Sequence, residues 1–427
     1  MSENKAGILK YVFTERYNLY FYCLLYMISH VYEYYTGSFL KPLFLCSYLW
    51  TLIIYLYHTF ISRKYLSNRI YRNAQIFLVL NILTTFIYPE NRRFSVLQDF
   101  AILIQYIFVF YSSFQSRDDQ QMRGILEKVM HIGVVITFVV SLASLIAVYS
   151  GSSLVWAQEN VTKYGRHRGF YFETNEAALY GYTSIMFSLY FLYKQNIRSV
   201  RENKILLLYM LNIPIQIFLI FMTGSRTNLL VLLFAVVCLF VHHARGIARN
   251  TMKTRTKWIA FLCLCVVFYI LLFTKYGFNR NLYYYMNRYP EFWTGNWEEK
   301  AKIINRVSSG RYYLWESSIR EWLKSPWIGY GLKSGNFTYT VYKNKTNSHN
   351  LLINTLLFSG IFGLITLIRH FVLICRNRRK MSAYPDFILW FFVSGFIIVS
   401  MLEVVLLYNG KAASAICWAI MGFLVFL

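Results

Sequence analysis

Three short polar motifs border apolar segments and carry the side chains best suited to chemistry. They are Thr346-Asn347-Ser348-His349-Asn350 before an apolar run, Thr223-Gly224-Ser225-Arg226 between two apolar runs, and Ser308-Ser309-Gly310-Arg311 inside a long polar stretch. An imidazole can take a proton from a hydroxyl near neutral pH, and the planar fork of arginine grips phosphate at two points. If the motifs share one membrane face, they predict a phosphate-binding site with His349 as a base.

Each motif alone also fits a structural role. Arg226 can be a surface arginine that reaches toward water, and His349 can be a satisfied histidine at a helix start. The hypothesis of a site rests on the expectation that three such motifs meet on one face.

Composition defines the class of protein that must position these motifs. Hydrophobic residues make up 57% of the 427 residues and charged residues only 15%. Long apolar runs recur along the chain, and a hydrocarbon layer about 30 Å thick requires helices of roughly 20 residues. The sequence therefore predicts an all-α, polytopic integral membrane protein with about twelve transmembrane helices and one large extracytoplasmic loop. The predicted spans are 17–35, 43–60, 73–88, 95–114, 131–150, 176–193, 205–222, 227–243, 257–274, 350–375, 387–405 and 412–427.

The distribution of lysine and arginine predicts the orientation. These residues concentrate in alternate segments between spans, such as 63–72, 194–204 and 245–257, and short cytoplasmic loops retain such residues during insertion. Both termini are therefore expected in the cytoplasm. The expected organisation is one integrated membrane domain: helices one to nine in 1–274, the extracytoplasmic loop in 275–348, and helices ten to twelve in 349–427.

The formal net charge of +25 does not indicate a nucleic-acid partner. The basic residues are dispersed between spans, where topology and anionic lipid headgroups account for them. Arg166 and Arg168 are exceptions because they fall on the outer side, where they could bind phosphate or simply remain solvated. Asn175, shortly after them, could cap a helix or bind a hydroxyl.

The outer loop contains a predicted amphipathic helix from Arg311 to Lys324. Apolar residues recur there at intervals of three and four, and Ser308 or Ser309 can cap the start. Such a helix is expected on the membrane surface. Tyr312 and Trp315 belong to an unusually aromatic loop, whose rings can stack on sugars or act as interfacial anchors.

Glu403 falls deep in the predicted eleventh span. Carboxylates within membranes are costly and are usually paired. The sequence leaves open whether Glu403 forms a structural ion pair or belongs to a proton path, and it does not identify the partner.

A transferase outside the cell has no nucleotide sugar to use, so it needs a preactivated donor in the membrane. A sugar on a lipid pyrophosphate fits these residues, because arginines can stabilise the departing pyrophosphate while His349 deprotonates the acceptor hydroxyl. The sequence shows no Asp-rich or Glu/His metal cluster and implies no cofactor. We therefore expect a metal-independent, inverting displacement.

The motifs resemble those of the bacterial O-antigen ligase and polymerase superfamily. The resemblance rests on Gly224-Ser225-Arg226-Thr227, Ser309-Gly310-Arg311 followed by Trp315, Pro326-Trp327-Ile328-Gly329-Tyr330-Gly331, and Ser348-His349-Asn350 leading to Gly360-Ile361-Phe362-Gly363. It extends from about Arg166 to Gly363. It implies that Arg226 and Arg311 bind undecaprenyl pyrophosphate and that His349 is the base. Ser225 and Asn350, which adjoin them in the motifs, are expected to support them.

The stretch around Asn175 departs from the family pattern. Arg168-Gly169-Phe170 with Thr174-Asn175 looks like a degenerate form of the family's Arg-Gly and Asn-Pro-Asn stretch. Glu176 stands where an asparagine would be usual.

Two activities share the scaffold that this resemblance implies. A polymerase transfers a growing glycan onto the next lipid-linked repeat unit, whereas a ligase transfers the finished glycan onto lipid A-core. Richness in Ile, Tyr, Phe, Asn and Lys is typical of AT-rich, often Gram-positive genomes and favours a capsular or exopolysaccharide polymerase. The expected location is the bacterial cytoplasmic membrane, with an extracytoplasmic active site. The expected partners are lipid-linked oligosaccharide donor and acceptor, membrane lipids and, optionally, a chain-length regulator.

A flippase for lipid-linked oligosaccharides is the alternative from another class. Transporters place polar groups near the bilayer midplane in related halves, whereas here the polar motifs gather at one face.

Overall fold

The computed structural model describes residues 12–36, 40–88, 94–114, 119–150, 169–171, 173–194, 204–248, 295–308, 310–332, 348–377, 385–408 and 410–425. Within these ranges the fold is helical and contains no β-strand. The chain divides into two compact units: unit 1 comprises Met1–Gly133, Tyr313–Ser382 and Ser400–Leu427, and unit 2 comprises Val134–Tyr312 and Ala383–Val399. Each unit is described by itself.

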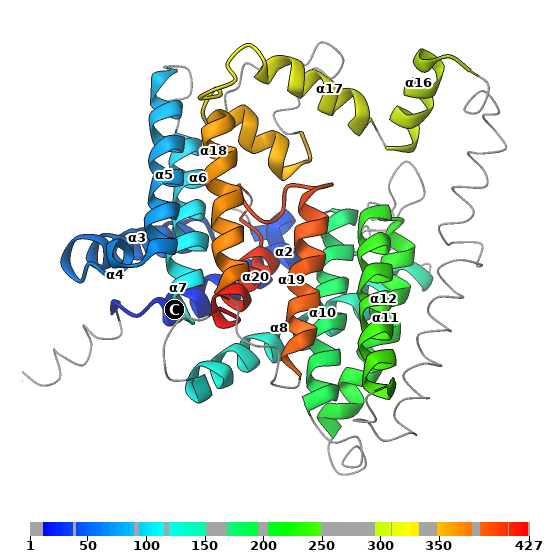
Figure 1. Ribbon diagram of the computed structural model, residues 1–427. Coiled ribbons are helices and arrows are strands. Elements are labelled where there is room, and N and C mark those ends of the chain that lie inside the picture. The colour runs from blue at the N-terminus through cyan, green and yellow to red at the C-terminus, as the bar shows by residue number, and fades with distance from the viewer. Residues whose placement is uncertain are drawn as a thin grey trace, which may run out of the picture. The chain divides into compact units, whose positions relative to one another are not determined.

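Unit 1 holds the first helices together with α18 and α20. Its elements are α2 (Glu15–Thr36), α3 (Leu40–Leu56), the π-helix η1 (Tyr57–Ile61), α4 (Lys64–Ser67), α5 (Arg69–Ile87), α6 (Phe94–Ile104), the π-helix η3 (Gln105–Phe110), α7 (Tyr111–Ser113), the first part of α8 (Asp119–Tyr149), most of α17 (Arg311–Trp322), α18 (Leu351–Arg376) and α20 (Ala412–Phe423). Helix α5 runs beside α18 (Figure 1), and the buried Asn73 side chain donates to the Thr366 backbone oxygen at 2.8 Å.

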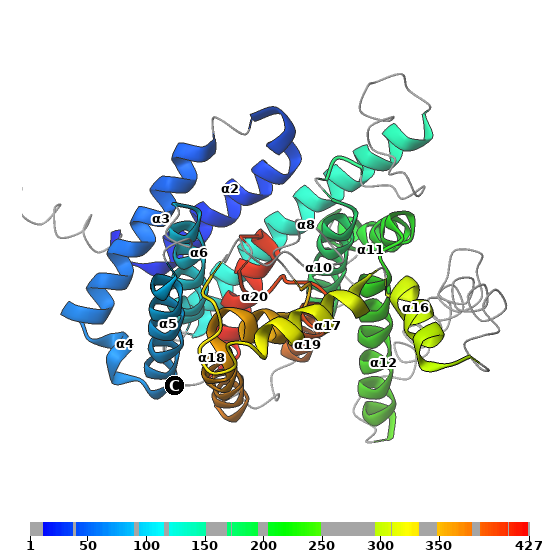
Figure 2. The same cartoon turned by 90° about the horizontal axis from the view of Figure 1, so that it is seen from above.

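Unit 2 is built around neighbouring helices of the middle of the chain. Its elements are the rest of α8, α10 (Thr174–Lys194), α11 (Lys204–Thr223), α12 (Arg226–Ala248), α16 (Trp297–Val307) and α19 (Asp386–Ser400). Figure 2 shows α10, α11 and α12 side by side. Buried amides link the first two: Asn212 Nδ2 donates to Ser184 Oγ at 2.8 Å and to Ser188 Oγ at 2.9 Å. These bonds satisfy polar groups that would be costly to leave unpaired in an apolar interior.

Six helices of the described residues are long and apolar enough to cross a membrane: Leu40–Ile61, Arg69–Ile87, Val96–Ser113, Arg123–Ala147, Lys204–Thr223 and Leu351–Arg376. Each overlaps a predicted span, but Arg123–Ala147 begins eight residues before the predicted span 131–150. Helices α2, α10 and α12 also lie at predicted spans, whereas the predicted span 257–274 lies outside the described residues. The protein is a helical, polytopic membrane protein, and the total of twelve spans stays a prediction.

Three predicted spans near the C-terminus differ from the structure. The predicted span 350–375 is interrupted at Gly360, whose φ of 63° and ψ of −164° break α18 into two limbs (Figure 1). The predicted span 387–405 is wrong at its end, because α19 stops at Ser400. In place of a span over 412–427, α20 has 12 residues, all of them buried. A helix that is apolar on every face is buried in protein as readily as in lipid, so hydropathy alone could not separate the two.

A helix is present where the sequence predicts one over 311–324: α17 begins at Arg311 and ends at Trp322, two residues early. Ser308 caps its start, since its Oγ accepts from Tyr312 N at 3.1 Å.

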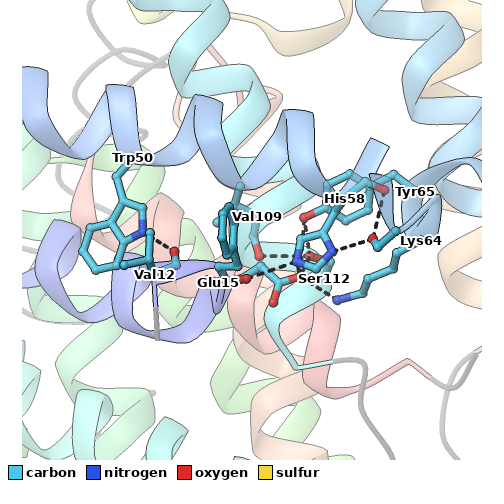
Figure 3. A network of polar contacts seen from close by, with 10 residues as sticks. Val12, Glu15, Trp50, His58, Lys64, Tyr65, Val109 and Ser112 are labelled. Atoms are coloured by element: carbon cyan, nitrogen blue, oxygen red, sulfur yellow. Dashed lines mark hydrogen bonds and ion pairs between the residues drawn. The ribbon is translucent and has the colours of Figure 1, made fainter. Parts of the chain in front are cut away.

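A polar network fixes the start of α2 in unit 1 (Figure 3). The carboxylate of Glu15 accepts a hydrogen bond from Lys64 Nζ at 2.5 Å and from Ser112 Oγ at 3.2 Å. His58 Nε2 lies 3.5 Å from the same carboxylate oxygen, and Tyr65 lies beside it. Because the Glu15 side chain is only 10% exposed, the network is largely shielded from water.

Candidate functional site

The site centres on the turn Ser348-His349-Asn350, immediately before α18 in unit 1. Asn350 is the N-cap of that helix: its side-chain oxygen accepts hydrogen bonds from Leu352 N at 2.9 Å and Ile353 N at 3.1 Å. Two N–H groups that a first helical turn leaves without intrahelical partners are thereby satisfied. His349, the residue before the cap, is held at the N-terminal end of α18.

The buried residue Ser348 anchors the other side of the turn. Its backbone N–H donates to Asn354 Oδ1 at 2.9 Å, and its hydroxyl donates to the same oxygen. Its carbonyl accepts from Trp315 Nε1 of α17 at 2.9 Å. The indole that the sequence offered as a glycan-binding group therefore holds the backbone beside His349.

The imidazole of His349 is oriented by a carboxylate. His349 Nδ1 lies 2.9 Å from Glu403 Oε2. The His349 side chain is 37% exposed, whereas the Glu403 side chain is only 12% exposed, so the carboxylate lies behind a ring that solvent can reach. An ionised carboxylate can only accept hydrogen bonds, which assigns the proton to Nδ1. The Nε2 lone pair of the neutral ring is then the one suited to accept a proton.

The sequence predicts Glu403 deep in the eleventh span, and this position is wrong. Glu403 lies in the non-helical segment 401–408 after α19. The partner that the sequence could not identify is His349, 54 residues earlier in the chain. A lone carboxylate in an apolar stretch indicates that a partner exists, but not which residue it is.

In unit 2, Arg226 is the first residue of α12, after a tight turn from α11. Gly224 adopts a φ of 60°, which reverses the chain, and Ser225 is buried. The Asn228 side chain donates to Ser225 Oγ at 2.9 Å and to the Asn175 backbone oxygen at 3.3 Å. Arg226 is therefore attached to a turn that its neighbours fix, at a helix N-terminus where backbone N–H groups favour an anion.

Asn175 does not cap α10. That helix begins at Thr174, and Ala177 N donates to the Glu173 oxygen at 3.0 Å, so Glu173 is at the cap position. The described role of Asn175 is to offer its carbonyl to Asn228 beside Arg226.

Arg311 occupies an equivalent place at the start of α17. Gly310, with a φ of 86°, turns the chain into the helix, and its N–H donates to the Asn305 oxygen at 2.7 Å. Arg311 and Trp315 lie one turn apart and therefore on the same face of α17. Arginine at a helix N-terminus combines a permanent charge with the positive end of the helix dipole, a combination suited to phosphate.

The two units divide the predicted site residues. His349, Asn350 and Trp315 belong to unit 1, whereas Asn175, Ser225, Arg226, Arg311 and Tyr312 belong to unit 2, and the division falls within α17. Within unit 1 the structure brings His349 together with Glu403, and within unit 2 it brings Ser225 together with Asn175 through Asn228. Arg166 and Arg168 lie outside the described residues.

Comparison with known proteins gives one family. A model of the O-antigen ligase family matches residues 211–368, from α11 to within α18. The matched stretch contains Arg226, Arg311, Trp315 and the His349 turn, but ends before Glu403. A comparison with curated proteins finds no match. Residues 211–368 are thus similar to the O-antigen ligase family, in agreement with the resemblance that the motifs show.

Proposed function

We propose that the protein is a polysaccharide polymerase of the bacterial cytoplasmic membrane. It transfers a growing glycan from undecaprenyl pyrophosphate to the next lipid-linked repeat unit, without a metal and with inversion at the anomeric carbon. Its donor and acceptor are both lipid-linked oligosaccharides, held at the outer face of the membrane.

The reaction is a single displacement. The acceptor hydroxyl oxygen attacks the anomeric carbon of the donor, and His349 Nε2 takes the hydroxyl proton. The bond between the anomeric carbon and the pyrophosphate oxygen breaks, and its electron pair leaves with the pyrophosphate. Arg226 and Arg311 neutralise the charge that develops there, the kind of stabilisation that often supplies the largest share of catalysis.

The observation that carries this proposal is the His349 imidazole within the family-matched stretch. Its Nδ1 faces Glu403 at 2.9 Å while the ring remains 37% exposed. A base must be both accessible to the acceptor and correctly protonated. This pair of properties supports His349 as the group that activates the acceptor hydroxyl.

The extracytoplasmic location is supported by the charge distribution. Lysine and arginine concentrate in the segments predicted to be cytoplasmic, so both termini are assigned to the cytoplasm and the loop that carries α17 to the outside. An outer site also explains why a lipid pyrophosphate is the required donor.

A ligase is the second candidate, favoured by the description of the matched family as O-antigen ligase. It would use the same base and the same arginines, and only the acceptor would differ. The composition that favours a Gram-positive source argues for the polymerase, because such cells lack lipid A.

The experiment is a gel profile of lipid-linked and released glycan from cells that carry wild type or His349→Ala at matched expression. Single repeat units that accumulate on lipid without a ladder would establish polymerisation. Full ladders that never leave the lipid would establish the ligase. Unchanged, fully processed ladders would overturn both assignments and favour transport.

A further inference from the structure

We propose that Glu403 is a positioning residue for His349, and that segment 401–408 completes the site from outside the matched stretch 211–368. The inference deepens the proposed function and rests on His349 as the base. The acidic group assigned here is one that the family comparison does not reach.

The first argument is the contact itself. The 2.9 Å separation of His349 Nδ1 and Glu403 Oε2 is the usual length of a nitrogen–oxygen hydrogen bond, and a charged acceptor makes such a bond stronger than a neutral one. Glu403 as a residue is 9% exposed. Burial of a carboxylate so far from water is costly unless a hydrogen bond compensates for it. The contact with His349 supplies that bond.

The second argument is that the backbone carrying Glu403 is fixed along its length. The Met401 oxygen accepts from Asn350 Nδ2 at 2.8 Å, so the turn that carries His349 also holds this segment. The Leu406 oxygen accepts from Trp418 Nε1 at 2.8 Å, and the Val405 oxygen accepts from Ser414 Oγ.

These bonds explain why non-helical backbone is tolerated next to apolar helices. Lipid cannot satisfy an exposed carbonyl, so irregular backbone at membrane depth must be bonded within the protein. The two donors from α20, Ser414 and Trp418, are fully buried. Helix α20, too short to be a typical span, serves as the support of segment 401–408.

The third argument is strained backbone in the turn that carries His349 and in segment 401–408. Among the described residues, positive φ outside glycine occurs at Arg63, His349 and Tyr408, with φ values of 53°, 53° and 62°. Such conformations cost of order 1–3 kcal/mol and persist where the surroundings impose them, often at functional sites. Here two of the three belong to the turn before α18 and to segment 401–408.

The pairing gives Glu403 a definite role in proton transfer. Glu403 accepts a hydrogen bond from Nδ1–H and so favours the tautomer in which Nε2 is unprotonated before the reaction. Once Nε2 takes the proton of the acceptor hydroxyl, the carboxylate stabilises the imidazolium. Glu403 itself stays ionised throughout. It acts through His349 and needs no contact with the substrate.

Other charged groups on the adjoining elements do not replace Glu403. Helix α17, which contacts the turn through Trp315, carries the ion pair Glu316–Arg320 at 2.7 Å. Glu321, also in α17, pairs with Lys324 just after the helix, at 2.7 Å. Arg311 begins the same helix, and Tyr408 is the other titratable side chain of segment 401–408. Glu403 is the carboxylate with a described bond to the imidazole.

The test measures the rate of glycan transfer against pH for wild type, Glu403→Gln and the exposed control Glu298→Gln, in proteoliposomes with lipid-linked repeat units. We expect Glu403→Gln to lose about a hundredfold or more, within the 10²–10⁴ range of general base catalysis. Without the adjacent negative charge, the imidazolium loses its proton more readily. The acidic limb of the Glu403→Gln profile should therefore lie at lower pH than that of wild type.

A purely structural role for Glu403 would lower the rate at every pH without moving the limb, and that result would overturn the proposal. A wild-type rate and limb for Glu403→Gln would also overturn it. If Glu403→Gln does not accumulate in membranes, Glu403→Asp decides: the shortened arm should slow transfer, and an unchanged rate would contradict positioning.

A double variant separates this inference from the proposed function. In a His349→Ala background, Glu403→Gln should cause no further loss, because the two residues act as a unit. If His349→Ala alone transfers normally, the base assignment fails. If His349→Ala is inactive while Glu403→Gln is normal, only the role of Glu403 fails.

Discussion

Gly329 packs directly against the backbone of Gly360, where the segment after α17 crosses the kink of α18. Both glycines have positive φ, 66° and 63°. A Cβ at Gly360 would lie 2.1 Å from the Trp327 carbonyl oxygen, and a Cβ at Gly329 would lie 2.5 Å from the Leu357 oxygen. Neither position has room for a side chain.

Hydrogen bonds replace those that the kink removes from α18. They are Tyr330 N to Leu357 O at 2.7 Å, Gly331 N to Phe358 O at 2.8 Å, and Ile361 N to Pro326 O at 2.9 Å. The crossing thus fixes the short limb of α18, which begins just after His349.

The first prediction concerns this crossing. Gly360→Ala should lower stability by about 2–4 kcal/mol, since it adds both a disfavoured φ and a clash with backbone. Gly124→Ala is the matched control, because a Cβ there meets nothing within 4 Å. Thermal unfolding in detergent should show a large drop for Gly360→Ala and no loss for Gly124→Ala. Equal melting temperatures would show that the crossing is not rigid.

The second prediction separates the two roles of Asn350. Serine can cap α18 with its hydroxyl but lacks the amide Nδ2 that reaches the Met401 oxygen, whereas alanine has neither group. Asn350→Ser should be more stable than Asn350→Ala by about 1 kcal/mol, yet both should slow transfer alike. Wild-type transfer by Asn350→Ser would show that the tie to segment 401–408 is dispensable.

The third prediction concerns the network around Glu15. Burial alone would raise the pKa of this carboxyl, but Lys64 and His58 outweigh it and hold the pKa below its ordinary value of 4.5. The stabilisation is therefore complete above pH 4.5 and is lost as the pH falls through the lowered pKa. Glu15→Gln should cost about 1.5–3 kcal/mol at neutral pH and flatten the acid dependence of the melting temperature.

The control for Glu15 is Glu298→Gln in α16. Glu298 pairs with Lys302 at 2.9 Å, but both side chains are largely exposed, 76% and 60%. Exposed pairs contribute little, so its melting temperature should stay near that of wild type. If Glu15→Gln and Glu298→Gln lowered the melting temperature equally, the buried network would contribute no more than an exposed ion pair.

The fourth prediction concerns the arginines. Arg226→Ala and Arg311→Ala should each reduce transfer by about 10²–10³-fold while leaving membrane insertion intact. Each substitution removes a positive charge that would stabilise the departing pyrophosphate. Lysine should restore part of the rate, because it keeps the charge but not the planar fork. Arg320→Ala, whose side chain is 77% exposed and paired with Glu316, is the control. If Arg311→Ala were as active as Arg320→Ala, Arg311 would not belong to the site.

Local patterns in the sequence predicted the features that depend on neighbouring residues. Apolar run length located the helices Leu40–Ile61 and Lys204–Thr223, and period and capping residues located α17. His349 and the helix after it were likewise apparent from a polar stretch that meets an apolar one.

Features that depend on distant contacts could not be predicted. The kink at Gly360 depends on a crossing segment that begins more than thirty residues earlier, at Pro326. The partner of Glu403 depends on where α19 ends, and hydropathy continued that helix because the following residues are also apolar. The burial of α20 depends on what surrounds it, which composition does not record.

The most direct test of the central claim uses purified protein in liposomes, with a lipid-linked repeat unit as both donor and acceptor. Wild type should build a ladder, release one undecaprenyl pyrophosphate per bond formed, and invert the anomeric configuration of the transferred sugar. His349→Ala, reconstituted in equal amount and with an equal melting temperature, should leave the repeat unit unjoined. A ladder of wild-type rate and length from His349→Ala would contradict the account.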